Sequence, residues 1–104
     1  MQESIYETAI ARGLPTDIES CIKHLESEIE ELRTAEPSTG LTPRKTRHIE
    51  SDKICMSLYN EFFKDRDISE IADMATICFT MAEELGEDLI DHILLKLRVN
   101  NLRL

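Results

Sequence analysis

Apolar positions recur at helical spacing along most of this chain, most regularly between residues 18 and 32. There the apolar side chains follow one another at intervals of four, three, four and three residues: Ile18, Ile22, Leu25, Ile29 and Leu32. This spacing places them on one face of an α-helix. Thr16 and Glu19 have the spacing of a capping box, which marks the start of a helix. The pattern therefore predicts an amphipathic helix over residues 18–32.

Residues 67–85 form a second helical pattern, which is apolar on almost every side. Its apolar members are Ile71, Ala72, Met74, Ala75, Ile77, Cys78, Phe79, Met81 and Ala82. Asp67 and Glu70 have the spacing of a capping box at its start, and Gly86 is suited to the left-handed conformation that ends a helix. A helix without a polar face is normally buried. We therefore expect this helix to lie at the centre of the fold.

Three further patterns extend the prediction of helices over most of the chain. Residues 2–12 predict a short leading helix that ends at Gly13, and residues 49–64 predict an amphipathic helix. After Gly86 a last helix has a predicted buried face: Leu89, Ile90, Ile93, Leu94 and Leu97. No segment of useful length alternates as a strand would. The expected fold is one all-α domain over residues 1–104, a bundle of four main helices plus a short N-terminal helix.

Residues 34–48 interrupt the helical patterns with two prolines and a glycine, and they predict a loop. The loop also carries a local group of basic residues: Arg44, Lys45, Arg47 and His48. Two interpretations stay open for this group, a solvated connection or a lid over a phosphate-bearing ligand.

Composition and charge exclude several classes of protein. A net charge of −9 argues against nucleic-acid binding and against binding to anionic membranes, both of which need a basic face. The longest charge-free run, residues 74–82, is far too short to span a membrane, and no signal-peptide pattern is present. The three cysteines are odd in number and lack metal-ligand spacing. We therefore expect a cytoplasmic protein with reduced cysteines.

Two pairs of carboxylates suggest a metal site. Glu28 and Glu31 lie one turn apart on one predicted helix, and Glu70 and Asp73 have the same spacing on the central one. Asp73 is the most informative of the four, because an ionised carboxylate in an apolar helix is costly unless it is paired or binds a metal. Each glutamate also has an alternative explanation. Glu28 and Glu31 could be solvated residues of a glutamate-rich helix, and Glu70 could be only the capping-box residue of its helix. Together the four oxygen ligands suit Mg²⁺ or Mn²⁺.

Further polar residues could bind a substrate beside such a metal. Lys96, Asn100 and Arg103 follow one another on one face of the last helix. Cations near a helix C-terminus also stabilise the helix dipole, so a structural role is the alternative. His24 lies on the same flank of its helix as Glu28, where it either lines a base pocket or is simply packed.

The paired motifs resemble those of the MazG-like all-α nucleoside triphosphate pyrophosphohydrolases, which carry Glu-x-x-Glu on one helix and Glu-x-x-Asp on the next. The resemblance covers about half of the chain and is closest over residues 69–103. It implies that a (d)NTP is hydrolysed between its α and β phosphates, giving (d)NMP and pyrophosphate with Mg²⁺ as cofactor. It also implies metal binding by the four carboxylates, with a catalytic role in orienting water for Glu28 or Glu31. Lys96, Asn100 and Arg103 would then meet phosphate or sugar.

The chain also departs from this family. Ser27 stands where many relatives have another glutamate, and the 38 residues between Glu31 and Glu70 exceed the usual gap. Residues 34–64 therefore look like an insertion. Family members are usually dimers or tetramers, and compact phage enzymes of the MazZ type act on purine deoxynucleotides. The resemblance thus suggests dGTP or dATP as substrates and a homodimer or tetramer as the assembly.

The wide apolar stripes also predict a homodimer or tetramer, because three of the helices carry more apolar surface than a four-helix monomer can bury. An alternative function is a non-catalytic helical interaction or regulatory protein related to this family. A third, more remote alternative is a related enzyme that acts on nucleoside diphosphates or phosphoribosyl-ATP. Binding of Mg²⁺ or Mn²⁺ separates enzyme from adaptor, because only the enzyme should gain thermal stability from the ion.

Overall fold

The structure is a computed structural model that describes residues 1–34, 49–64 and 66–104. For residues 49–52 it describes the backbone only. Within these residues every regular element is a helix, which confirms the expected all-α class. The helices are α1 (Gln2–Ala11), α2 (Ile18–Thr34), α3 (Ile49–Phe62), α4 (Asp67–Glu84) and α5 (Leu89–Leu102). None of the described helices is both long and apolar enough to cross a bilayer.

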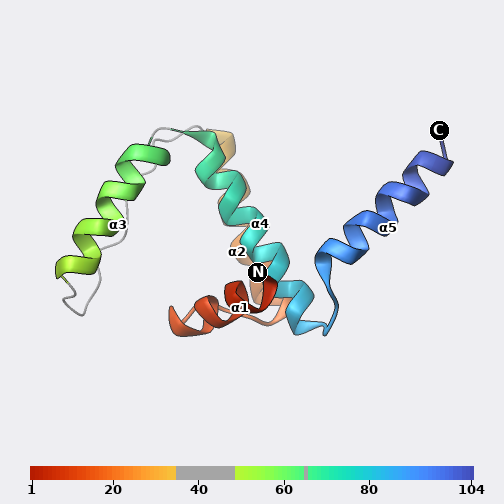
Figure 1. Ribbon diagram of the computed structural model, residues 1–104, viewed down its shortest axis with the longest axis horizontal. Coiled ribbons are helices and arrows are strands. Elements are labelled where there is room, and N and C mark those ends of the chain that lie inside the picture. The colour runs from red at the N-terminus through yellow and green to blue at the C-terminus, as the bar shows by residue number, and fades with distance from the viewer. Residues whose placement is uncertain (35–48, 65) are drawn as a thin grey trace.

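Helix α4 is the centre of the packed part of the molecule. α2 lies along it and α1 crosses it, while α5 contacts it only where the chain turns from one helix into the other (Figure 1). Among the described residues, α3 packs extensively against no other helix. The arrangement therefore differs from the expected bundle of four main helices: α1, the short leading helix, belongs to the packed unit, and α3 and α5 extend away from it.

The core of this unit is built largely from small side chains. One residue of α1, one of α2 and three of α4 are buried: Ala9, Cys21, Ile77, Thr80 and Ala82. Small side chains let the helix backbones approach closely. On α2, Cys21 is 1% exposed whereas Ile22 is 44% exposed, so the flank of Cys21 faces inward rather than the centre of the apolar stripe. The reason is that α2 packs extensively only against α4, which covers one side of that stripe.

The helix ends correct two expectations and bear out a third. Asp17, not Thr16, caps α2, because its carboxylate accepts from the backbone N–H of Ser20 at 3.0 Å. The expected capping box of α4 is wrong: the N-cap is Arg66 and no side chain caps it, since Asp67 already lies in the first turn. Gly86 has a φ of +71° and its N–H donates to the Glu83 carbonyl, as expected for the residue after a helix end.

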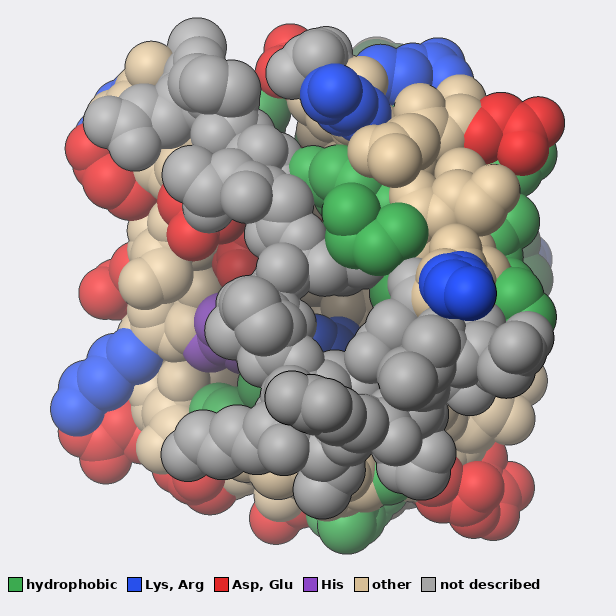
Figure 2. Space-filling view, turned by 90° about the vertical axis from the view of Figure 1, so that its left-hand side faces the viewer, with side chains coloured by type: hydrophobic (Ala, Val, Ile, Leu, Met, Phe, Trp, Pro, Cys, Tyr) green, Lys and Arg blue, Asp and Glu red, His purple; other side chains and the backbone are tan. Residues whose placement is uncertain are grey.

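The two outer helices leave much of their apolar surface open. No residue of α5 is buried, so the predicted buried face of this helix is wrong for a single chain. Most described apolar side chains of α3, and that of Phe63 directly after it, are exposed too: Ile54, Met56, Leu58, Phe62 and Phe63. The chain measures 50 × 28 × 23 Å and its radius of gyration is 15.9 Å, above the roughly 13 Å of a compact domain of this size. Figure 2 shows hydrophobic side chains at the surface of one face, beside charged ones.

Candidate metal centre and adjoining cavity

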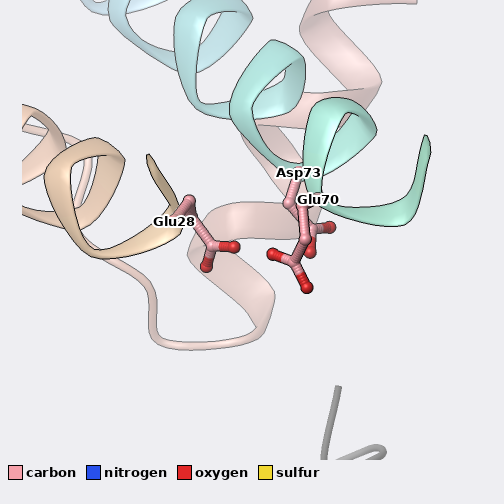
Figure 3. A group of neighbouring side chains, drawn as sticks. All are labelled: Glu28, Glu70 and Asp73. Atoms are coloured by element: carbon pink, nitrogen blue, oxygen red, sulfur yellow. The ribbon is translucent and has the colours of Figure 1, made fainter. Parts of the chain in front are cut away.

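Three carboxylates from two helices meet where α2 packs against α4. Glu70 and Asp73 are one turn apart on α4 and point to the same side, and Glu28 of α2 faces them (Figure 3). One carboxylate oxygen from each residue lies within 4.8 Å of those of the other two. The i, i+3 spacing sets the α4 pair, and the packing of α2 brings the third carboxylate to it.

Two of the carboxylate oxygens in this cluster are buried without a hydrogen-bond partner. They are Oε2 of Glu28 and Oε2 of Glu70. The other oxygen of Glu28 lies 3.4 Å from Nε2 of His24, and the Glu28 side chain is only 13% exposed. A buried, unpaired carboxylate oxygen is costly, so the site favours either a proton or a cation between these groups.

The surroundings of Glu28 and Asp73 disfavour the ionised form of both carboxyl groups, which raises their pKa. Burial, the adjacent Glu70 carboxyl and the charges of Glu31 and Asp73 raise the pKa of Glu28 to about 8. Burial and the charge of Glu70 also raise the pKa of Asp73, although Arg12 and His24 oppose this. Like charges crowded together in this way disfavour ionisation, and a divalent cation would relieve the repulsion.

Glu31, the fourth predicted ligand, lies at the edge of the cluster. Its side chain is exposed, and it does not belong to the set of three whose oxygens converge. Burial and the charge of Glu70 nevertheless raise the pKa of the Glu31 carboxyl, so it lies within electrostatic reach of the centre. Glu31 is therefore not one of the converging ligands. From its position it could contact a bound ion through a water molecule, or contact a second ion.

The converging carboxylates fit a small divalent cation. Mg²⁺ binds oxygen ligands at about 2.0–2.1 Å, so two ligands on opposite sides of the ion lie about 4.2 Å apart. One oxygen from each of Glu28, Glu70 and Asp73 lies within 4.8 Å of the other two, a separation comparable to this distance. Three carboxylates would leave further coordination positions for water and substrate, which is the usual arrangement for Mg²⁺.

A cavity of about 400 Å³, open to solvent on one side, adjoins the carboxylates and is lined by residues of α1, α2, α4 and the turn after α1. Glu28 and Asp73 contribute to its lining, together with His24 and Arg12. The other lining residues have uncharged side chains: Met1, Ser4, Ile5, Thr8, Ala9, Leu14, Pro15, Cys21, Thr76, Ile77 and Thr80. Figure 2 shows acidic side chains and a histidine close to one another on one face of the molecule. The volume lies within the range of small-molecule sites.

Threonines supply most of the neutral polar groups in this cavity. The hydroxyls of Thr8, Thr76 and Thr80 donate to backbone carbonyls one turn earlier in their own helices, at 2.8–2.9 Å. Because each hydroxyl proton is used within the helix, its oxygen is left as an acceptor. The cavity therefore combines charged groups with a neutral wall that can accept hydrogen bonds from N–H or O–H groups of a ligand.

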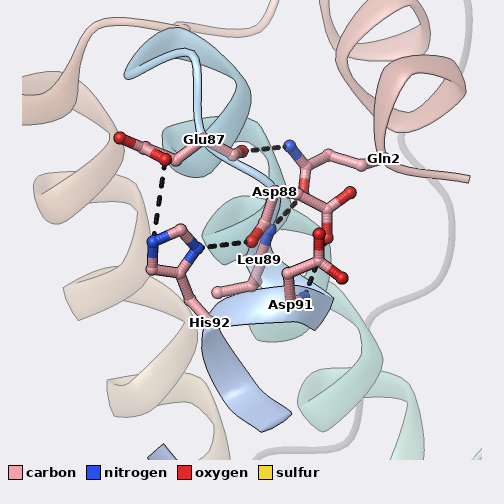
Figure 4. Close-up of polar contacts among 6 residues, drawn as sticks. All are labelled: Gln2, Glu87, Asp88, Leu89, Asp91 and His92. Carbon is pink, nitrogen blue, oxygen red and sulfur yellow. Dashed lines mark hydrogen bonds and ion pairs between the residues drawn. The ribbon is translucent and has the colours of Figure 1, made fainter. Parts of the chain in front are cut away.

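Helix α1, which forms one wall, is held in place by its first residue. The Gln2 side-chain amide donates to the Glu87 carbonyl at 2.6 Å, and its oxygen accepts from the Leu89 backbone N–H at 2.8 Å (Figure 4). The same amide nitrogen also lies 2.9 Å from a carboxylate oxygen of Glu83. Tyr6 donates to Glu84 at 2.8 Å. These bonds fasten the start of α1 to the turn between α4 and α5.

The residues predicted to bind substrate lie in different places. His24 lines the cavity, which is the position that a role in a base pocket would need. Lys96 and Asn100 on α5 and Arg103 at its C-cap are exposed, and this helix leads away from the carboxylates of its own chain (Figure 1). The basic residues 44–48 lie outside the described part of the chain. Sequence reasoning missed Arg12, whose only signal is its place on the same helix face as Ser4 and Thr8.

Comparisons with protein-family models, with curated proteins and with solved structures give no match to this chain. The resemblance to MazG-like enzymes therefore rests on the residue pattern of the sequence. What the structure adds is independent of that resemblance: carboxylates that converge, two buried oxygens without a hydrogen-bond partner, and a cavity beside them.

Proposed function

We propose that this protein is a metal-dependent nucleoside triphosphate pyrophosphohydrolase, which converts a (d)NTP and water to a (d)NMP and pyrophosphate. The observation that carries the proposal is the convergence of Glu28, Glu70 and Asp73, with two buried oxygens that have no partner, at the edge of a ligand-sized cavity. A divalent cation compensates those oxygens, and a cation beside a cavity is what phosphoryl transfer requires.

Each of the four carboxylates has a role in this proposal. Glu28, Glu70 and Asp73 hold the Mg²⁺ or Mn²⁺ ion, and Glu31 orients water at the rim. When bound, the ion neutralises phosphate oxygens and lowers the pKa of a coordinated water. His24 and the threonine oxygens line the space in which the nucleoside would lie. The volume of about 400 Å³ is in the range of small-molecule sites, and we propose a purine deoxynucleotide such as dGTP or dATP as substrate.

The reaction is expected to release pyrophosphate as one unit. Water attacks the α phosphorus, the bond from that phosphorus to the bridging oxygen breaks, and the bridging oxygen leaves with the β and γ phosphates. Incubation with Mg²⁺ and each common (d)NTP should give monophosphate without a diphosphate intermediate. In ¹⁸O-labelled water the label should enter the monophosphate. Stepwise release of orthophosphate, or label only in pyrophosphate, contradicts this chemistry.

Self-association is part of the same proposal. The apolar side chains that α3 and α5 leave exposed are too many for a stable solvated surface, and a symmetric homodimer or a dimer of dimers would cover them. In such an assembly Lys96, Asn100 and Arg103 of one subunit would be free to approach the cavity of another. The substrate role expected for these residues then depends on the partner copy.

The exposed helices also support a second candidate, a non-catalytic helical interaction protein. Open apolar faces on α3 and α5 are what a partner-binding helix presents. The two candidates differ in their response to cations. The enzyme should gain thermal stability from Mg²⁺ or Mn²⁺ at millimolar concentration, whereas an adaptor should show no shift.

A further inference from the structure

We propose that Arg12, at the end of α1, is a substrate-binding residue that contacts the phosphate chain of the nucleotide in the cavity. The inference rests on the proposed function and deepens it, because it assigns the phosphate-binding cation to a helix outside the carboxylate motifs. It depends on the position of Arg12, on the lack of an ion-pair partner for its guanidinium among the described residues, and on the charge that a bound nucleotide brings.

The position of Arg12 is defined by the end of its helix. Arg12 is the C-cap of α1, and the chain turns directly after it through Gly13, which has a φ of +71°. The Gly13 N–H donates to the Ile10 carbonyl and the Leu14 N–H to the Ala9 carbonyl, so the turn is closed by two hydrogen bonds. Ala9 is buried against the core. The backbone that carries Arg12 is therefore well fixed beside the cavity.

Among the described residues that line the cavity, Arg12 is the only lysine or arginine. Its guanidinium has no carboxylate within 4.0 Å among the described residues, although it acts on the Asp73 carboxyl through space. A cation close to an acidic cluster, yet not paired with it, is available to an anionic ligand. Arginine also suits phosphate because its planar fork donates two parallel hydrogen bonds.

The charge balance of the site calls for such a residue. Glu28, Glu31, Glu70 and Asp73 bring up to four negative charges, and a nucleoside triphosphate brings several more to the same place. One divalent ion cannot offset both sets, and phosphoryl transfer depends on neutralising the phosphates. Lys96 and Arg103 lie on α5, which leads away in the same chain. Of the lysines and arginines that the structure describes, Arg12 is the one that the fold places at the cavity.

Binding of inorganic tripolyphosphate in the presence of Mg²⁺ tests this role without requiring turnover. In calorimetric titrations, Arg12→Gln should weaken tripolyphosphate binding by about 10- to 100-fold, as expected for the loss of a charge-assisted hydrogen bond. Arg12→Lys should recover part of the affinity, because it keeps the charge and loses the fork. Mg²⁺ alone should still bind to both variants with an affinity no lower than that of the wild type. Lys23→Gln, an exposed site on α2, is the matched control and should leave binding unchanged.

Kinetics with the best nucleotide give a second measurement. For Arg12→Gln we expect the KM to rise at least about 10-fold, with a smaller change in melting temperature than in binding. If the wild type binds tripolyphosphate through Arg12 but hydrolyses no nucleotide, this inference stands and the proposed activity fails. If nucleotide is hydrolysed and Arg12→Gln behaves as the wild type, the inference is overturned and the activity stands. A wild type that does not bind tripolyphosphate overturns the inference as well.

Discussion

The three helices α1, α2 and α4 and the two outer helices α3 and α5 have similar hydrophobic content but very different surroundings. In the first group small residues such as Ala9 and Cys21 are buried and the carboxylates converge. In the second group large apolar residues such as Leu94 and Phe62 remain about half exposed or more. The comparison shows that an apolar helix face is buried only where the chain also supplies a helix to cover it.

The same comparison separates the chemistry of the molecule from its assembly. All residues of the candidate metal centre and the lining of the cavity come from α1, α2 and α4 and their flanking turns. The helices α3 and α5 contribute surface that suits a partner. If this division is correct, substitutions in the two regions should have different consequences, and four experiments test it.

The largest effect should come from Asp73→Asn in the packed region. Removal of a charge from the metal centre should reduce turnover at least about 100-fold, since even residues behind metal ligands contribute 10- to 100-fold. The Mg²⁺-dependent thermal shift should also disappear. Without metal, stability should hold or rise, because the negative charge of Glu70 no longer opposes a carboxylate at position 73.

Glu26→Gln, an exposed position on α2, is the control for this substitution and should leave both measurements unchanged. Activity assays and thermal melts with Mg²⁺ or with a chelator provide the readout. A variant that loses stability equally with and without metal would show that Asp73 has only a structural role.

The second experiment addresses the outer region. Light scattering at micromolar concentration should find a dimer or a tetramer. The double substitution Phe62→Glu with Leu94→Glu should weaken self-association by at least roughly 30-fold, about 2 kcal/mol, because charges would be buried in the interface. Asn60→Glu, on another face of α3, is the control. A monomeric wild-type protein contradicts the proposed assembly.

The third experiment uses pH to examine the packed region. The pKa of Glu28 is about 8 in the folded protein against an ordinary value of 4.5, and those of Glu31 and Asp73 are raised as well. A raised pKa means that the folded state binds more protons, so its stabilising effect is complete below about pH 4.5 and is lost as the pH rises through 8. In the presence of a chelator, the melting temperature should therefore fall between these pH values.

Saturating Mg²⁺ should reverse this trend, because the ion competes with protons for the carboxylates. Glu28→Gln should flatten the metal-free pH dependence, since the group with the largest shift no longer titrates. A metal-free melting temperature that rises steadily from pH 5 to pH 8 would contradict the described clustering of the carboxylates.

The smallest effect concerns the junction of the two regions. Gln2→Ala removes the amide that connects α1 to the turn before α5. The loss should cost about 1–3 kcal/mol, because three polar groups lose a partner at a partly buried site. Glu3→Ala, at an exposed neighbouring position, should change stability much less. Chemical denaturation measures the free energy of unfolding of both variants. Equal values for Gln2→Ala and Glu3→Ala would indicate that Gln2 does not hold α1 in place beside the cavity.

The sequence by itself determined the helices and the spacing within each of them. Periodicity predicted all five segments, and Gly86 was identified as a helix end, because both depend on residues close together in the chain. The pairing of Glu70 with Asp73 has the same local origin. Capping was less predictable: Thr16 and Asp17 are both good caps, and only the actual start of α2 selects Asp17.

Only the tertiary structure decided how the helices face one another. The inward rotation of Cys21, His24 and Glu28 depends on many contacts between α2 and α4, whereas the stripe of Ile22 and Ile29 alone would have placed another face inside. Arg12 lies 61 residues from Asp73 in the chain, and no periodic pattern connects them. Their approach follows from the crossing of α1 over α4 (Figure 1), because the relative rotation and register of helices are properties of the packed core rather than of any single segment.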